Sequence, residues 1–244
     1  VFVLAGMGGG TGTGAAPVAA QVAKETGAVV IGVVTMPFES EKARIDKAEF
    51  GLQELRDSTD TCIVLDNNRL VDIAGQLPIE QAFAVANELV STMIKGIVET
   101  ITLPSLINLD YADVSSIMKD GGVSVIGIGE ADSQDRVNEA VRQALTHPLL
   151  DVDYKGARGA LIHVTCGPDL KLEEFDTIGR TVSENLSPDA QVIIGARISK
   201  DFVGKVRVIT IMTGVKSPYV LGKDSGMDKE QVHREMSDLG IEIL

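Results

Sequence analysis

The sequence has only two cysteines, fewer basic than acidic residues and no long apolar run, and each of these shortages excludes a class of protein. Cys62 and Cys166 both lie in apolar runs, which indicates buried thiols in a reducing cytosol rather than a disulfide scaffold. The 22 Lys and Arg against 35 Asp and Glu give a net charge of −13, which argues against nucleic acid as the main partner. The longest apolar run, Gly27–Val34, is far shorter than the ~20 residues that span a bilayer.

What is present is the composition of a globular protein. The chain has 244 residues, of which 44% are hydrophobic and 23% charged, enough for one large or two modest domains. Its first residues, Val1-Phe2-Val3-Leu4, already have the pattern of a β-strand, and there is no initiator methionine. We therefore expect the chain to be the C-terminal portion of a longer protein.

The first half of the chain alternates strand and helix patterns. Continuous Val/Ile runs separated by helical patterns are typical of a doubly wound α/β domain, in which helices cover both faces of a parallel sheet. The expected strands are Val1–Leu4, Ala28–Val34 and Thr61–Leu65, and the expected helices are Ala15–Thr26 and Arg44–Arg56. A long apolar helix, Glu80–Leu103, should follow as a buried spine between layers.

The second half predicts a smaller α+β unit with fewer helices per strand. Its expected helices are Asp110–Lys119, Asp135–Leu145 and Leu172–Asn185, and its expected strands are Val123–Ile128, Ala160–Thr165, Val192–Ala196 and Val206–Met212. We divide the chain into a first domain, 1–115, a second, 116–222, and a flexible acidic tail, 223–244, with an apolar end at Leu239–Leu244.

A glycine motif, Gly8-Gly9-Gly10-Thr11-Gly12-Thr13-Gly14, follows the first strand and opens a helix. Glycines let the backbone approach an anion closely, the helix N-terminus adds a positive dipole, and threonine hydroxyls can donate to phosphate oxygens. A tight turn between strand and helix is the simpler interpretation. Six glycines within residues 6–14 exceed what such a turn needs, so the motif favours a phosphate ligand.

The kind of nucleotide is a separate question. A P-loop needs a lysine after its last glycine, and no lysine precedes Lys24, so that motif is excluded. Gly10–Ala15 fits the loose dinucleotide-binding pattern G-x-G-x-x-A, which also requires an acidic residue at the end of the second strand. That strand ends in Thr35-Met36-Pro37 without one. The dinucleotide interpretation is weakened but stays open.

At this point the motifs become specific for one family. Residues 8–14 resemble the signature loop of the tubulin/FtsZ family of GTPases, and the chain as far as Gly222 resembles the archaeal cell-division members of that family. The resemblance implies a cytoplasmic GTP-binding and GTP-hydrolysing protein that polymerises head to tail into filaments of a division ring. Implied ligands are GTP or GDP and Mg²⁺, the ion held mainly by phosphate oxygens and water. The apolar end Leu239–Leu244 on its acidic stem indicates a docking peptide for a membrane adaptor or another division protein, where a frayed end is the simpler interpretation. Family members carry another glycine-rich phosphate loop upstream.

The same resemblance assigns residues that follow the second and third strands. Glu41 and Arg44 match the positions that serve the ribose and its surroundings, with Glu39 as a substitute for Glu41. From chemistry alone this segment is an ordinary charged helix start. Asn67 matches the family's asparagine near the guanine base, where the simpler interpretation is an Asn-Asn turn.

Two residues of the long helix are assigned in the same way. Phe83 and Asn87 are four residues apart and therefore on one face, where a ring and an amide could stack on a purine and bond its edge. Taken alone, Phe83 is a core residue at helical spacing. The resemblance implies the stacking phenylalanine and the base-reading amide.

An acidic motif, Asn108-Leu109-Asp110-Tyr111-Ala112-Asp113, opens the next helix. Asp110 and Asp113 share a face near the positive end of the helix dipole, which suits water orientation or a simple N-cap with an acidic first turn. The resemblance makes Asn108, Asp110 and Asp113 the catalytic residues, acting on the nucleotide of a neighbouring subunit. The long helix separates the two motifs by a distance on the order of 30 Å, so catalysis should depend on assembly.

Other functions and sites remain as alternatives. The chain could be a nucleotide-binding structural polymer with little hydrolysis, or a dinucleotide-dependent oxidoreductase. His163 lies in an apolar strand and indicates a satisfied core histidine, and no spacing of His or Cys predicts a protein-held metal. His147 and His233 fall in a turn and in the tail, and Asp151 and Asp153 are typical of a solvated turn.

Overall fold

The structure, a computed structural model, describes residues 1–119, 122–146, 154–184 and 186–215. The predicted tail and its apolar end, together with His147, His233, Asp151 and Asp153, lie outside the described residues. None of the helices in the described part is both long and apolar enough to cross a membrane.

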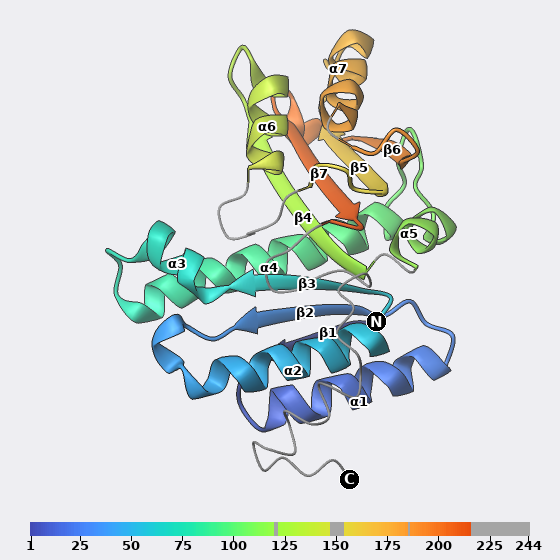
Figure 1. The fold of residues 1–244 in the computed structure, drawn as a ribbon. Helices are drawn as coiled ribbons and strands as arrows, with labels where there is room; N and C mark the ends of the chain where they lie inside the picture. Colours follow the sequence, from blue (N-terminus) through green and yellow to red (C-terminus); the bar gives the residue numbers. More distant parts are fainter. Residues whose placement is uncertain (120–121, 147–153, 185, 216–244) are drawn as a thin grey trace.

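The first half is the predicted parallel α/β layer. Strands β1 (Phe2–Gly6), β2 (Ile31–Met36) and β3 (Thr61–Asp66) pair in parallel, and helices α1 (Thr11–Glu25) and α2 (Ala43–Ser58) connect them. Alternate residues of β2 enter different cores: Val34 packs with α1 and α2, whereas Ile31 and Val33 face the other side with α4 (Ile79–Thr102). Figure 1 shows α1 and α2 together on one face of these strands. Burial on both faces explains the continuous apolar runs.

Two boundaries of the first half differ by more than two residues from the sequence-based expectation. Strand β2 begins at Ile31 rather than Ala28, because the amide of Val30 donates to the Asp60 carboxylate at 2.8 Å instead of joining the strand ladder. Helix α1 begins at Thr11 rather than Ala15, so Gly12–Gly14 form its first turn. Weak helix formers are tolerated there because the first turn has unpaired amides in any helix.

The long helix α4 was expected to be a buried spine, and this expectation is wrong for its first half. Met93 and Ile97 in the second half are buried, but Ile79 is 73% exposed and Phe83 38% exposed. The first half packs beside α3 (Asn67–Ala74), a helix that the sequence analysis did not predict, while the second half lies against the sheet. Apolar periodicity therefore overstated the burial of this helix.

The second half continues the same sheet with a different geometry. Strand β4 (Gly122–Ala131) pairs in parallel with β3 only through Thr61–Gly122 and Cys62–Val123, then runs antiparallel to β7 (Val206–Thr213). Strands β5 (Gly159–Cys166) and β6 (Gln191–Ile198) complete the order β1-β2-β3-β4-β7-β5-β6. Helices α5 (Tyr111–Met118), α6 (Arg136–Leu145) and α7 (Leu172–Ser183) and a short 3-10 helix, η2 (Lys200–Phe202), are the other elements of this half in the described part. The mixed α/β fold class is confirmed, while the division at residue 115 stays a prediction.

Candidate functional site

The glycine motif forms the turn from β1 into α1. Gly8 has φ +93°, a conformation that favours glycine, and a Cβ there would lie 2.8 Å from the Arg44 carbonyl oxygen. Its amide donates to Thr13 Oγ1 at 3.0 Å, so this amide is already used within the motif. Gly12 packs so closely on the Gly6 carbonyl oxygen that a Cβ would overlap it. These glycines shape the turn.

Other glycines of the motif leave space. Gly9, Gly10 and Gly14 have nothing within 4 Å of a Cβ position, and all three are exposed. Gly14 donates its amide to the Gly10 carbonyl, whereas the four amides of residues 10–13 are those that a helix start leaves without an intrahelical acceptor. Open space beside unpaired amides at the positive end of a 15-residue helix fits a phosphate group. Amides of this kind bind an oxyanion without any basic side chain.

The loop after β2 lies beside this turn. It contains a short 3-10 helix, η1 (Glu39–Glu41), followed by α2. Glu41 accepts from the amide of Phe38 at 3.1 Å through one oxygen and pairs with Arg44 Nη1 at 2.6 Å through the other. The structure thus places Arg44 next to Gly8 and binds it to Glu41, while the Glu39 side chain is exposed.

Asn67 follows β3 and is the first residue of α3. The preceding residue, Asp66, is buried and caps this helix, accepting from the amide of Asn68 at 2.8 Å. The Asn68 side chain also donates to Asp66 at 2.8 Å and accepts from the amide of Glu39 at 2.9 Å. Sequence reasoning missed Asp66 and Asn68, although an Asp two residues before an Asn at a strand end is a recognisable capping pattern.

Phe83 and Asn87 lie on the exposed half of α4. The Phe83 ring packs edge-on against Phe38, with centroids 6.3 Å apart and planes at 68°. Phe38 belongs to the loop that carries Glu41, so the loop after β2 touches α4 here. Asn87, one turn further, is exposed. The structure therefore gathers the predicted nucleotide-binding residues around the carboxyl ends of β1, β2 and β3, the usual place for a ligand in such a sheet.

The acidic motif forms the start of α5. Asp110 caps this helix by accepting from the amide of Asp113 at 2.9 Å, and Asp113 accepts from the amide of Asp110 at 3.0 Å. This reciprocal capping box is the simpler of the two interpretations that the sequence left open. Each carboxylate uses one oxygen in it, and the second oxygen of each has no hydrogen-bond donor among the described residues. Asn108 is exposed beside them, and Leu109 is buried against Gly195.

The two motifs lie at opposite ends of the sheet. The hydroxyl of Tyr111, in the acidic motif, accepts from the amide of Val29 at 3.3 Å, just before β2 begins, whereas Pro37 and Phe38 follow its other end. Eight residues of extended chain measure about 26 Å. In Figure 1, α5 lies at one end of the strands and α3 at the other. One nucleotide cannot contact both motifs of the same subunit.

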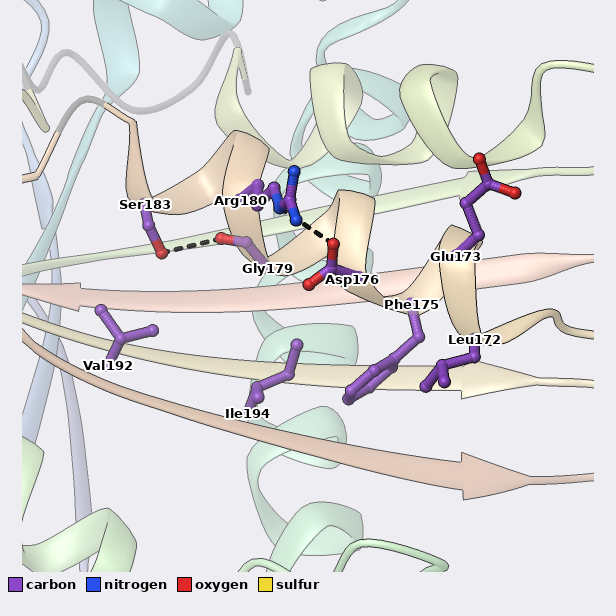
Figure 2. A pocket seen from close by; sticks show the side chains of 9 residues that line it. All are labelled: Leu172, Glu173, Phe175, Asp176, Gly179, Arg180, Ser183, Val192 and Ile194. Carbon is purple, nitrogen blue, oxygen red and sulfur yellow. Dashed lines mark hydrogen bonds and ion pairs between the residues drawn. The ribbon is translucent and has the colours of Figure 1, made fainter.

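A groove lies outside both motifs, between α7 and β6. Its volume is about 790 Å³. Figure 2 shows Leu172 and Phe175 of α7 facing Val192 and Ile194 of β6 across it, with Arg180 paired to Asp176 at the rim. None of the predicted site residues lines it. In the described part of the chain, no group of three or more His, Cys, Asp or Glu side chains is arranged to hold a metal ion.

His163 and the cysteines are buried, as predicted. Burial raises the pKa of the Cys62 thiol to about 12, so this thiol stays protonated. His163 is 2% exposed, and burial together with Arg197 lowers its pKa to about 4, against a smaller opposing effect of Glu99. Its Nδ1 has no hydrogen-bond partner among the residues that the structure describes. The expectation of a satisfied core histidine is therefore wrong in one respect: the ring is buried, but its Nδ1 is not satisfied by any described residue.

Comparisons with known proteins bear directly on this fold and site. Residues 1–75 match the Tubulin/FtsZ family, GTPase domain, and residues 122–216 match the FtsZ family, C-terminal domain. The chain is 53% identical, over 98% of its length, to Cell division protein FtsZ 2 of Methanocaldococcus jannaschii, and 54% identical, over 98%, to Cell division protein FtsZ 2 of Halobacterium salinarum. An empty FtsZ dimer structure from M. jannaschii superposes with a TM-score of 0.79 at 44% identity, covering 93% of this chain and 70% of that one.

Both halves of the fold are thus those of tubulin-like GTPases. Within that class, the chain belongs to the FtsZ family of cell-division proteins, which confirms the resemblance read from the motifs. It spans 66% and 61% of the length of the two curated relatives. The oxidoreductase alternative receives no support from these matches.

Proposed function

We propose that the full-length protein binds and hydrolyses GTP and polymerises head to tail into filaments of the division ring in the cytoplasm. The observation that carries the proposal is the separation of the two motifs: a phosphate-binding turn at one end of the sheet and a pair of carboxylates at the other. A neighbouring subunit that presents its acidic motif to the glycine motif brings the two together. Such a head-to-tail contact generates a filament when its rotation does not close into a ring.

Binding rests on the residues at the carboxyl ends of the strands. The amides of residues 10–13 would hold the phosphates, with Gly8, Gly9, Gly12 and Gly14 shaping the turn and leaving room for them. Arg44 and Glu41 would serve the ribose side, Asn67 and Asn87 the base edge, and Phe83 the base face. Mg²⁺, when bound, offsets the phosphate charge from phosphate oxygens and water.

Hydrolysis would rest on positioning rather than on a covalent intermediate. The free carboxylate oxygens of Asp110 and Asp113 from the next subunit would orient a water molecule toward the γ-phosphate, and exposed Asn108 lies beside them. The capping box supports this role, because it fixes both side chains while leaving one oxygen of each available. Filaments would reach the membrane through an adaptor that binds Leu239–Leu244, in the tail outside the described residues.

The experiment that tests the proposal is GTP turnover per subunit measured against protein concentration, using the full-length protein. Turnover should be negligible below a threshold concentration and rise above it, in step with sedimentable filaments. A constant, nonzero turnover per subunit at all concentrations would place the whole active site inside one subunit. Binding and assembly without turnover would instead favour the structural polymer.

A further inference from the structure

The loop after β2 is the least regular part of the candidate site. It consists of one short 3-10 helix and Lys42, the only residue other than glycine with a positive φ (25°) in the described part of the chain. Yet this loop carries Glu41 and leads to Arg44, which lies against Gly8. Its position relative to the other loops must therefore be fixed by side chains.

Asn68 makes a bridge from this loop to the end of β3. Its Oδ1 accepts from the amide of Glu39 at 2.9 Å, and its Nδ2 donates to Asp66 Oδ1 at 2.8 Å. Asp66 is buried at the strand end and is itself held by its cap on α3. The side-chain oxygen of Asn68 thus has its partner on the loop after β2, and the side-chain nitrogen has its partner at the end of β3. The two contacts together fix the orientation of this side chain.

A continuous series of contacts leads from Asn68 to the glycine motif. Glu39 follows Phe38, whose amide is bound by one oxygen of Glu41, and the other oxygen of Glu41 binds Arg44. The backbone and Cβ of Arg44 lie against the position of Gly8. A change in the bridge should therefore shift the loop, and with it the predicted ribose contacts Glu41 and Arg44, relative to the phosphate-binding turn.

We propose that Asn68 is a positioning residue for the nucleotide. It sets the spacing between the loop after β2 and the loop after β3, so that Arg44 and Asn67 can contact the same bound nucleotide. The inference rests on the proposed nucleotide binding. Preorganisation of this kind improves affinity, because the loop has less freedom to lose when the ligand binds.

The test uses Asn68→Ala and Asn68→Asp in the full-length protein, with a fluorescent GTP analogue titrated onto each variant. Alanine removes both contacts, whereas aspartate keeps the acceptor for Glu39 but cannot donate to Asp66 when ionised. Both variants should weaken binding about tenfold, equivalent to about 1.4 kcal/mol. Turnover at saturating GTP, above the assembly threshold, should stay within about twofold of wild type, because the bridge acts on binding.

Asn138→Ala is the matched control. Asn138 Nδ2 also donates to an aspartate at a helix start, Asp135, at 2.7 Å, but within the described ranges its side chain bonds no second loop. Its Kd should equal that of wild type. The inference is overturned if Asn68→Ala binds with the wild-type Kd, or if it lowers the melting temperature of the nucleotide-free protein and the turnover at saturating GTP together. Failure of the wild type itself to bind the analogue would instead refute the proposed function.

Discussion

At the scale of single residues, the glycine motif contains glycines of two kinds. Gly8 and Gly12 are required by the fold, since a Cβ at either would meet backbone atoms of Arg44 or Gly6. Gly9, Gly10 and Gly14 face open space instead. The first kind builds the turn, and the second keeps it open to a ligand, so substitutions should have different effects at the two kinds of position.

Gly12→Ala and Gly14→Ala separate these two kinds by stability alone. Gly12→Ala should lower the free energy of unfolding by about 1–3 kcal/mol, because its Cβ would overlap the Gly6 carbonyl oxygen. Gly14→Ala, in the first turn of α1, should be neutral or stabilising by up to about 1 kcal/mol. Denaturant unfolding without nucleotide measures both. Equal destabilisation by the two substitutions would contradict the packing described for the turn.

His163 should make stability depend on pH. Its folded pKa of about 4 is below the value of 6.5 expected in the unfolded chain, so the unfolded state binds more protons between these values. Stability is therefore fully present above about pH 6.5 and is lost as the pH falls toward 4, by up to about 1.4 kcal/mol per pH unit. Urea unfolding at pH 5 to 7.5 measures the slope. His163→Leu should show a shallower slope than wild type, and identical slopes would refute the assignment.

At the scale of elements, the second half depends on close contact between α6 and β4. Gly127 and Gly129 on β4 face the helix backbone, and a Cβ at either would run into a carbonyl oxygen, of Ala144 or Ala140. The helix can lie this close only because β4 has glycine at these positions. The contact joins the core of the second half to the strand that continues the first sheet.

Gly127→Ala should therefore push α6 away from the sheet and cost about 3 kcal/mol or more in unfolding free energy. Gly179→Ala, on α7, is the matched control, because its Cβ would meet only Ile194 at an ordinary 3.6 Å. It should be neutral or slightly stabilising. Thermal unfolding compares the two. A Gly127→Ala variant as stable as the control would show that α6 moves away at little cost.

Strands and long helices could be predicted because the runs and spacing of apolar residues indicate which segments are buried. Cys62–Leu65 is a continuous apolar run, and in Val206–Met212 only Arg207 and Thr210 are polar; both segments are strands within a residue or two of the expected bounds. Helix α3 was missed because Asp66-Asn67-Asn68 resembles a turn, although Leu70 and Ala74 enter a core. The start of α1 was missed because glycine and threonine are poor helix formers, although its first turn contains them.

The site could be predicted in part, for a similar reason. Motifs at strand ends identified the segments around Gly8, Arg44 and Asn67, because the carboxyl ends of parallel strands meet at one edge. Contacts between those segments could not be predicted. The bond from Glu39 to Asn68 and the contact of Phe38 with Phe83 join residues far apart in sequence, and they depend on how the loops pack.

At the scale of the whole molecule, the central claim is that each active site is shared by two subunits. Tyr111 ties the acidic motif to the start of β2, and the glycine motif lies at the other end of that strand.

Two variants each remove one half of such a site. Gly10→Asp should abolish phosphate binding without disturbing the fold, since aspartate is a favoured N-cap residue and its Cβ meets nothing within 4 Å. Asp113→Asn should keep the capping box, because its amide oxygen can still accept, while removing the carboxylate charge proposed to act in catalysis.

The most direct measurement is GTP turnover by an equimolar mixture of these two full-length variants, each inactive alone, with co-sedimentation confirming that both enter the same filaments. A nucleotide on the Asp113→Asn subunit can meet the intact acidic motif of a Gly10→Asp neighbour. With random mixing, about a quarter of the contacts are then complete, so turnover should recover to about a quarter of wild type. Turnover in mixed filaments no higher than the sum of the two variants alone would contradict a site shared between subunits.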